Sequence, residues 1–262
     1  MNLSLKGKRA VVCGSSQGIG KAIAIALSFQ GASITLVSRN ELKLKKVLNQ
    51  LDSGNDQKHN YVVADFIDDQ SVNEIFLKFL KKGNKIDILI NNTGGPPPGR
   101  IINARVEDFE KYMKMHLNCS HLLTKLFLPN MKKRKFGRII NVISISVKAP
   151  IDNLGVSNTV RWAMASWSKT LSNEVAKYGI TVNNILPGFT MTDRLKNLIQ
   201  ENSKNQNKSI DEIEKNYKAL IPSERFALPE EIASSVSFLC SNEASYINGI
   251  NLPIDGGYSS SL

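Results

Sequence analysis

The stretch Gly14-Ser15-Ser16-Gln17-Gly18-Ile19-Gly20 decides the fold because of what flanks it. The apolar run Arg9–Cys13 precedes it, and the amphipathic pattern Gly18–Gln30 follows it. Glycines at these positions allow a tight turn in which backbone N–H groups and the positive end of a helix face an anion. A strand, a glycine-rich turn and a helix in this order predict the phosphate-binding turn of a dinucleotide site, whereas a merely flexible glycine loop fits this context poorly.

The alternation of strand and helix continues along the chain. The predicted strands are near-continuous apolar runs, which are typical of parallel strands buried on both faces. They are Arg9–Cys13, Ser33–Ser38, Asn60–Ala64, Ile86–Asn91, Arg138–Ile143, Thr181–Leu186 and Asn251–Ile254. Helical patterns lie between them at Gly18–Gln30, Glu41–Leu51, Asp69–Lys81, Val106–Lys132, Gly155–Lys177 and Pro229–Ser241. We therefore expect an α/β fold: one Rossmann-type, doubly wound parallel sheet of about seven strands, with helices on both faces, in a single domain over residues 1–262.

One segment departs from this alternation of strands and helices. Residues 193–220 are polar and helix-prone, and they follow a predicted strand end. Open α/β sheets bind ligands at the carboxyl ends of their strands, so the segment could form a lid over a substrate. A tolerated surface insertion is the alternative, and the sequence leaves both open.

The composition excludes several classes of protein. Among 262 residues, 42% are hydrophobic, which is enough for a packed core and excludes a disordered chain. No apolar stretch is long enough to span a membrane. The three cysteines, Cys13, Cys119 and Cys240, have no paired spacing. We therefore expect neither a disulfide framework nor a metal site, and a cytoplasmic location.

The net charge of +11 raises the question of nucleic-acid binding. The densest basic run is Lys132-Lys133-Arg134-Lys135, followed by Arg138. No aromatic platform interleaves the run, and no nucleic-acid-binding motif surrounds it. We interpret it as a solvated basic surface and expect no nucleic-acid partner.

The end of the second predicted strand bears on the choice of cofactor. NAD sites place an acidic residue here to accept hydrogen bonds from the ribose, but this chain has Ser38-Arg39-Asn40. The planar guanidinium of Arg39 suits a 2′-phosphate, so we expect NADP(H) in preference to NAD(H). A solvated loop charge is the alternative interpretation of Arg39.

Together these residues resemble the short-chain dehydrogenase/reductase family over nearly the whole chain. Gly14-x-x-x-Gly18-x-Gly20 matches its cofactor loop, with Cys13 in place of the usual Thr. Asp65 matches its adenine-binding Asp, and Asn91-Asn92-Thr93-Gly94 is similar to its Asn-Asn-Ala-Gly. Pro187-Gly188-Phe189-Thr190-Met191-Thr192 resembles its Pro-Gly-x-x-x-Thr segment on the nicotinamide side. The cofactor-binding residues that the resemblance implies are Gly14, Ser15, Ser16, Gln17, Gly18, Ile19, Gly20, Ser38, Arg39, Asn40, Asp65, Phe66, Asn92, Thr93, Gly94, Arg161, Pro187, Gly188, Thr190 and Thr192.

The catalytic positions depart from the family, which uses an Asn-Ser-Tyr-Lys set. Ser144 stands where the family has its Ser, but the Tyr position is Ser157 and the Lys position is Arg161. The Asn position matches His116. None of the six tyrosines is followed four residues later by Lys, so no shift of the alignment restores the motif.

These replacements change the expected proton chemistry. A Ser hydroxyl is a far weaker acid than a phenol, whose pKa is about 10. The guanidinium of Arg161 holds its proton, yet it can bind ribose hydroxyls and stabilise an oxyanion. His116 has the ordinary pKa best suited to proton transfer, directly or through water; a packed helix residue is the alternative.

The stretch Gly94-Gly95-Pro96-Pro97-Pro98-Gly99 predicts a rigid wall of the substrate pocket, with a plain surface loop as the alternative. The chain resembles a subgroup, similar to 3-oxoacyl-carrier-protein reductases, that has this loop and lacks the usual Tyr and Lys.

The sequence therefore favours an NADP(H)-dependent oxidoreductase acting on a small carbonyl or alcohol, including 3-oxoacyl-like substrates. A nucleotide-binding sensor or partner subunit without turnover is the alternative. The resemblance further implies a homotetramer or homodimer through the helices at Val106–Lys132 and Gly155–Lys177.

Overall fold

A computed structural model of the chain describes residues 2–54 and 56–261 and contains a seven-stranded parallel sheet. The strands are β1 (Arg9–Cys13), β2 (Ser33–Ser38), β3 (Asn60–Val63), β4 (Ile88–Asn91), β5 (Gly137–Val142), β6 (Ile180–Pro187) and β7 (Asn251–Ile254). Their order in the sheet is β3-β2-β1-β4-β5-β6-β7. The chain builds outward from β1 in one direction and then from β4 in the other, which confirms the predicted doubly wound fold. Such sheets bind ligands where the direction reverses, here between β1 and β4.

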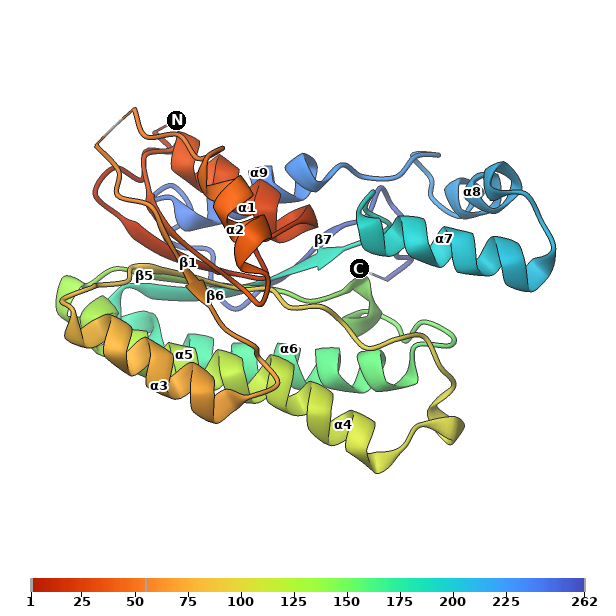
Figure 1. Ribbon diagram of the computed structural model, residues 1–262, viewed down its shortest axis with the longest axis horizontal. Coiled ribbons are helices and arrows are strands. Elements are labelled where there is room, and N and C mark those ends of the chain that lie inside the picture. The colour runs from red at the N-terminus through yellow and green to blue at the C-terminus, as the bar shows by residue number, and fades with distance from the viewer. Residues whose placement is uncertain (1, 55, 262) are drawn as a thin grey trace.

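Helices cover both faces of the sheet (Figure 1). One face carries α1 (Gly18–Phe29), α2 (Glu41–Leu48) and α9 (Pro229–Cys240), and the other carries α3 (Asp69–Lys81), α4 (Val106–Met113), α5 (Cys119–Arg134) and α6 (Gly155–Val175). Successive side chains of a strand enter opposite layers. In β2, for example, Leu36 packs in the α1 layer and Val37 packs in the α5 layer. Burial on both faces explains why these strands are continuous apolar runs.

The predicted helix over Val106–Lys132 is wrong in one respect: it is interrupted. A π-helical turn at Lys114–Asn118 separates α4 from α5. Such a turn inserts one extra residue into the helical ladder and rotates the side chains that follow it. The turn carries His116 and directs it into the buried side of the element.

The polar segment after β6 forms two helices, α7 (Asp193–Gln206) and α8 (Ile210–Ala219), which lie beside each other at one end of the molecule (Figure 1). They have a hydrophobic cluster of their own, which joins Leu195, Ile199 and Ile213 to Ile221 and Phe226. The ring of Phe189, just after β6, stacks on Tyr217 of α8 at 5.2 Å. The segment is therefore a packed unit anchored to the end of the sheet.

A row of asparagines crosses four neighbouring strands of the sheet, from the end of β4 to the start of β7. Asn91, Asn141, Asn184 and Asn251 are neighbours in register on β4 to β7. Each side-chain amide donates to the next carbonyl oxygen, at 2.8, 2.9 and 2.7 Å in turn. Asn141 also donates to Ser168 of α6. Buried amides need such partners, so the row fixes the register beneath the ligand-binding edge.

The interpretation of the basic run as solvated surface is wrong for Arg138. This side chain is only 2% exposed, and its guanidinium donates to the carbonyl oxygens of Ser241 and Gly137. Backbone carbonyls thus satisfy a cation that has no carboxylate partner. Arg134 pairs with Asp87 at 3.1 Å, and Lys132 lies over the ring of Tyr178. Much of the run is therefore engaged within the fold.

In the part of the chain that the structure describes, no helix has the length and apolar character needed to cross a bilayer. Cys13, Cys119 and Cys240 are all buried and form no disulfide.

Candidate active site

The glycine turn joins β1 to α1 at the reversal point of the sheet. Gly14 and Gly18 have φ values of 60° and 56°, a left-handed conformation that favours glycine. A Cβ atom on Gly20 would lie 2.3 Å from the carbonyl oxygen of Gly14, and one on Gly14 would lie 2.3 Å from that of Asn92. The glycines are thus required by backbone geometry, and they leave the amide-rich face of the turn free of side chains.

The first turn of α1 is prepared for an anion. Gln17 is the N-cap residue, its side chain does not cap the helix, and no acidic residue stands in the first turn. The N–H groups of a helix start favour negative charge, so a pyrophosphate fits here. Ser16 and Ile19 lie half-buried in this turn. Ser15 is fully buried, and its hydroxyl accepts a hydrogen bond from the Val37 N–H, so it holds the turn against β2.

The end of β2 presents a cation to solvent. The side chain of Arg39 is 70% exposed, and its Nη1 lies 3.8 Å from Oδ2 of Asp65 at the end of β3. An exposed pair at this distance is weak, so Arg39 is available to an anionic ligand. Asn40 caps α2 by accepting from the Lys43 N–H, and Ser38 is buried.

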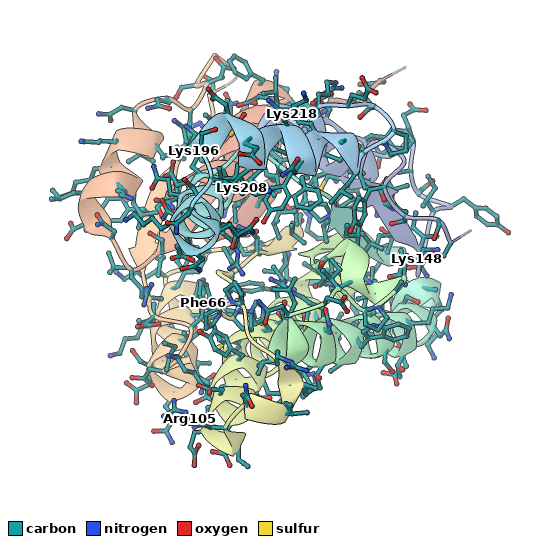
Figure 2. All side chains as sticks on the ribbon, turned by 90° about the vertical axis from the view of Figure 1, so that its right-hand side faces the viewer. Phe66, Arg105, Lys148, Lys196, Lys208 and Lys218 are labelled. Atoms are coloured by element: carbon teal, nitrogen blue, oxygen red, sulfur yellow. The ribbon has the colours of Figure 1, made fainter. Side chains whose placement is uncertain are left out.

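The segment after β3 borders the crevice on the side where the resemblance predicts the adenine. One carboxylate oxygen of Asp65 accepts from the Ile67 N–H. Phe66 packs into the core beneath α3 and α5, and its carbonyl oxygen accepts from the thiol of Cys119. Phe66 therefore supports this edge from behind, and Figure 2 shows it in the middle of the face that looks toward the ends of the strands.

The residues after β4 and β6 complete the crevice. The side-chain amide of Asn92 donates to the carbonyl oxygens of Cys13 and Gly14, which ties β4 to the glycine turn. Thr192 caps α7, and its methyl group would lie 3.3 Å from a Cβ on Gly18. The predicted lid unit, which consists of α7 and α8, thus begins directly against the glycine turn.

The other predicted residues after β6 contact the backbone of neighbouring segments. Thr190 is buried and donates to the carbonyl oxygen of Gly188. A Cβ on Gly188 would lie 2.8 Å from the Cα of Asp255, so Gly188, which follows Pro187, allows the chain to pass close to the Asp255-Gly256-Gly257 segment.

The predicted catalytic residues come from three elements. Ser144 follows β5, and its hydroxyl accepts from the Ser146 N–H at 3.1 Å. Ser157 is buried in α6, one helical turn before Arg161. Nη1 of Arg161 donates to the carbonyl oxygen of Val142 at 3.1 Å, so the guanidinium reaches the end of β5. Burial, and then the charge of Arg194, lower the pKa of Arg161 to about 10, which leaves it a cation at neutral pH.

His116 does not have the proton chemistry that we expected from its ordinary pKa. It is 4% exposed, its Nδ1 lies 2.7 Å from Oγ1 of Thr93, and its buried Nε2 has no hydrogen-bond partner among the residues that the structure describes. Burial, followed by the charge of Arg161, lowers the pKa of His116 well below its usual value. Burial therefore favours the neutral form of the ring, which makes an imidazolium acid at this position unfavourable.

The proline-rich loop is held at both ends, as a rigid wall requires. Gly99 donates to the carbonyl oxygen of Asn153 at 2.7 Å and accepts from the Gly155 N–H at 3.0 Å. At the other end, Arg194 of α7 donates to the carbonyl oxygens of Gly95 and Pro96, at 2.9 and 2.7 Å.

Sequence reasoning missed Arg194 and Tyr112. Arg194 follows the Thr192 cap by two residues, a position that predicts proximity to the crevice but not a contact with a loop 99 residues away. Tyr112 stands one helical turn before His116, with 6.5 Å between the ring centres. Its spacing to His116 was the available signal, because a Tyr and a residue four positions later share one face of a helix.

Two cavities lie near these residues. A cavity of about 10 Å³, the space of a single water, is lined by Thr93, His116 and Arg161 among others. A larger one, of about 400 Å³, lies at the base of the lid unit between Phe189, Arg225 and the Asp255-Gly256-Gly257 segment.

The sequence is similar to known reductases over nearly its full length. The family model described as enoyl-(acyl carrier protein) reductase matches residues 14–259. The chain is 32% identical over 259 residues to the 3-oxoacyl-[acyl-carrier-protein] reductase FabG of Aquifex aeolicus, with 98% of this chain and 99% of that protein covered. It is 33% identical over 260 residues to the NADPH-dependent reductase BacG of Bacillus subtilis, with 97% and 99% covered.

Solved structures share the fold. The L-sorbose reductase of Gluconobacter frateurii, complexed with NADPH and L-sorbose, superposes with a TM-score of 0.93 at 31% identity, and the match covers 100% of both chains. YwfH, an NADPH-dependent reductase involved in bacilysin biosynthesis, superposes with a TM-score of 0.90 at 32% identity over 97% of this chain and 99% of that one.

Proposed function

Because the chain belongs to the short-chain dehydrogenase/reductase family, in the group similar to 3-oxoacyl-[acyl-carrier-protein] reductases, we propose that it is an NADP(H)-dependent reductase of a small carbonyl compound. The observation that carries the proposal is the intact glycine turn with a cation, Arg39, at the end of β2. The relatives that are named NADPH-dependent support the same cofactor for this chain.

The residues present fit this cofactor. The glycine turn and the start of α1 bind the pyrophosphate, Arg39 binds the 2′-phosphate, and Asp65 borders the adenine. Thr93 and Gly94 after β4, and the segment that runs from Pro187 to Thr192, border the nicotinamide end. When bound, NADPH supplies the hydride.

The chain's own catalytic contribution is electrostatic. Ser144 donates a hydrogen bond to the substrate oxygen, and the guanidinium of Arg161 stabilises the negative charge that this oxygen gains. A fixed cation in a site that excludes water is effective because it needs no reorganisation as charge develops. Neither Ser157 nor neutral His116 is a suitable acid, so the proton that completes the alcohol comes from water. The cavity beside His116 and Arg161 has room for one.

The lid unit and the proline-rich loop form the walls of the substrate pocket in this proposal. Arg194 links them, so movement of α7 would move one wall against the other. We further propose a cytoplasmic location, which the three buried and unpaired cysteines support. We also propose a homodimer or homotetramer, which the exposed apolar side chains of Ile102, Val106 and Trp162 support.

The cofactor claim has a direct test. We expect the wild-type protein to bind NADPH more tightly than NADH by about tenfold or more, since a charge-assisted pair contributes about 1.5–3 kcal/mol. Arg39→Asp should remove this preference, and fluorescence titration with each cofactor measures it. Arg105→Asp, at the start of α4, is the control for charge. Equal wild-type affinities for NADPH and NADH would contradict the claim.

Binding without turnover is the second candidate, and the replaced Tyr and Lys positions favour it. Incubation with NADPH and a panel of carbonyl compounds separates the two functions by loss of NADPH absorbance. The reductase proposal expects consumption that Ser144→Ala depresses strongly. Tight NADPH binding with no consumption, together with turnover gained by Ser157→Tyr plus Arg161→Lys, would support the non-catalytic function instead.

A further inference from the structure

Two arginines from opposite walls of the crevice meet at Gly95. A Cβ atom on Gly95 would lie 3.1 Å from Nη2 of Arg161 and 3.0 and 3.1 Å from the two terminal nitrogens of Arg194. Arg161 comes from α6 and Arg194 from the first turn of α7. A side chain at this position would crowd both guanidinium groups, which are therefore close neighbours.

Neither arginine has an acidic partner. Within residues 2–54 and 56–261, no carboxylate forms an ion pair with Arg161 or Arg194. Backbone carbonyls accept from three of their terminal nitrogens. Arg161 is only 8% exposed, and its Nε is buried without a partner. Two like charges placed together, one of them buried, are costly unless an anion neutralises them.

The two arginines differ in access. Arg194 is exposed to solvent at the start of the lid unit, whereas Arg161 lies behind it at the end of β5. An incoming anion would therefore meet Arg194 first and then lie close to Nη2 of Arg161. The buried, unpartnered Nε2 of His116 lines the same small cavity as Arg161.

We propose that Arg161 and Arg194 form a binding site for a carboxylate group of the substrate, so that the compound reduced is a short oxo acid. The inference rests on the proposed function, in which Arg161 also faces the carbonyl oxygen. Arg161 can contact both the carboxylate and the carbonyl oxygen of the substrate only if these two groups are close together along the carbon chain. The geometry thus favours 2-oxo and 3-oxo acids over neutral ketones, sugars and thioesters. Arginine suits this role because its planar fork matches a carboxylate.

The test compares matched acids and esters. We would measure kcat/KM with NADPH for 2-oxobutanoate and 3-oxobutanoate and for the methyl ester of each. Wild-type protein should prefer each acid over its ester by about tenfold or more, the range expected of a hydrogen-bonded charge. Arg194→Gln should remove that preference, because it should lower kcat/KM for the acids about tenfold more than kcat/KM for the esters while the affinity for NADPH is unchanged. Arg194→Lys should recover part of the preference.

The matched control is Lys196→Gln, which removes the same charge from an exposed position on the same helix (Figure 2). The Lys196→Gln variant should keep the wild-type preference for acids over esters. If Arg194→Gln weakens acid and ester alike, Arg194 only holds the proline-rich loop and the inference is overturned. If it weakens NADPH binding while the preference for acids persists, the arginines serve the cofactor and the inference is again overturned.

A binding measurement keeps this inference separate from the proposed function. If no carbonyl compound is reduced, calorimetric titration of 2-oxobutanoate into the protein loaded with NADP⁺ still probes the anion site. Binding that Arg194→Gln weakens by about tenfold and Lys196→Gln leaves unchanged would support the site without any turnover. Absence of binding to the wild-type protein would overturn it.

Discussion

The replaced catalytic residues act as a group. In place of a phenol and an amine there are a small hydroxyl at Ser157 and a permanent cation at Arg161, and His116 stands where the family has Asn. The pKa of Arg161 stays at about 10, and that of His116 lies well below its usual value. At neutral pH the site therefore holds a fixed positive charge and a neutral ring, an arrangement that suits charge stabilisation better than proton transfer.

The protonation of His116 predicts an acid-sensitive stability. An unfolded His takes up a proton near pH 6.5, whereas folded His116 does so only well below that pH. The free energy of unfolding should thus fall as the pH drops below about 6.5, by up to about 1.4 kcal/mol per pH unit from this group. His116→Asn should reduce the slope of the unfolding free energy against pH by that amount. Urea unfolding at pH 7.5, 6.5 and 5.5 measures this slope.

His121→Asn is the control for His116, because His121 is exposed, although its Nδ1 accepts a hydrogen bond from the indole N–H of Trp167. It should leave the pH slope unchanged. Identical slopes for the wild type and His116→Asn would show that the ring of His116 is not held neutral by the fold.

Among the elements, the asparagine row explains how neighbouring strands are held in line. Strands β4 to β6 are buried, and their polar row adds to the register that apolar contacts already specify. A chain of amides between Asn91, Asn141, Asn184 and Asn251 is satisfied only in one register. The loop after β4 carries Thr93, which contacts His116. The loops after β5 and β6 carry Ser144 and the helix cap Thr192. The asparagine row therefore helps to position the strands from which the site residues follow.

Removal of an asparagine should reduce the stability of the fold more in the middle of the row than at its end. Asn141→Ala should destabilise the fold by about 3 kcal/mol, because it leaves the buried amide of Asn91 and the buried carbonyl of Asn184 without partners. Asn251→Ala, at the exposed end of the row, removes one hydrogen bond and should cost about 1 kcal/mol. Urea unfolding of the two variants compares them. Equal losses would mean that the row is not a cooperative network.

At the scale of the whole molecule, several large apolar side chains remain uncovered near one end of α4 and on α6. Ile102 is 76% exposed, Val106 68% and Trp162 48%. Ile101, next to Ile102, packs its backbone against Gly155 at the start of α6, which brings these two helix starts together. Apolar surface of this kind is typical of contacts between subunits, and these are the helices that the resemblance assigned to assembly.

We therefore expect a particle of at least two copies of the 29.0 kDa chain in light scattering coupled to gel filtration. Trp162→Lys should shift the population toward the single chain, because a charge in a buried contact between subunits is costly. Phe29→Lys, which alters a 68% exposed ring at the end of α1, is the control and should leave the mass unchanged. A wild-type protein that elutes as a single chain would contradict the assembly.

The order of elements, the parallel sheet and the glycine turn follow from the amino-acid sequence alone, because these depend on local periodicity and on what glycine permits. The sequence also established that the Tyr and Lys of the family are absent. Only the tertiary structure decided that Arg138 is buried, that His116 is held neutral in a π-helical turn, and that Arg194 meets Arg161 at Gly95. Burial, protonation and the meeting of charges depend on residues distant in the chain, and local sequence patterns carry no measure of those distances.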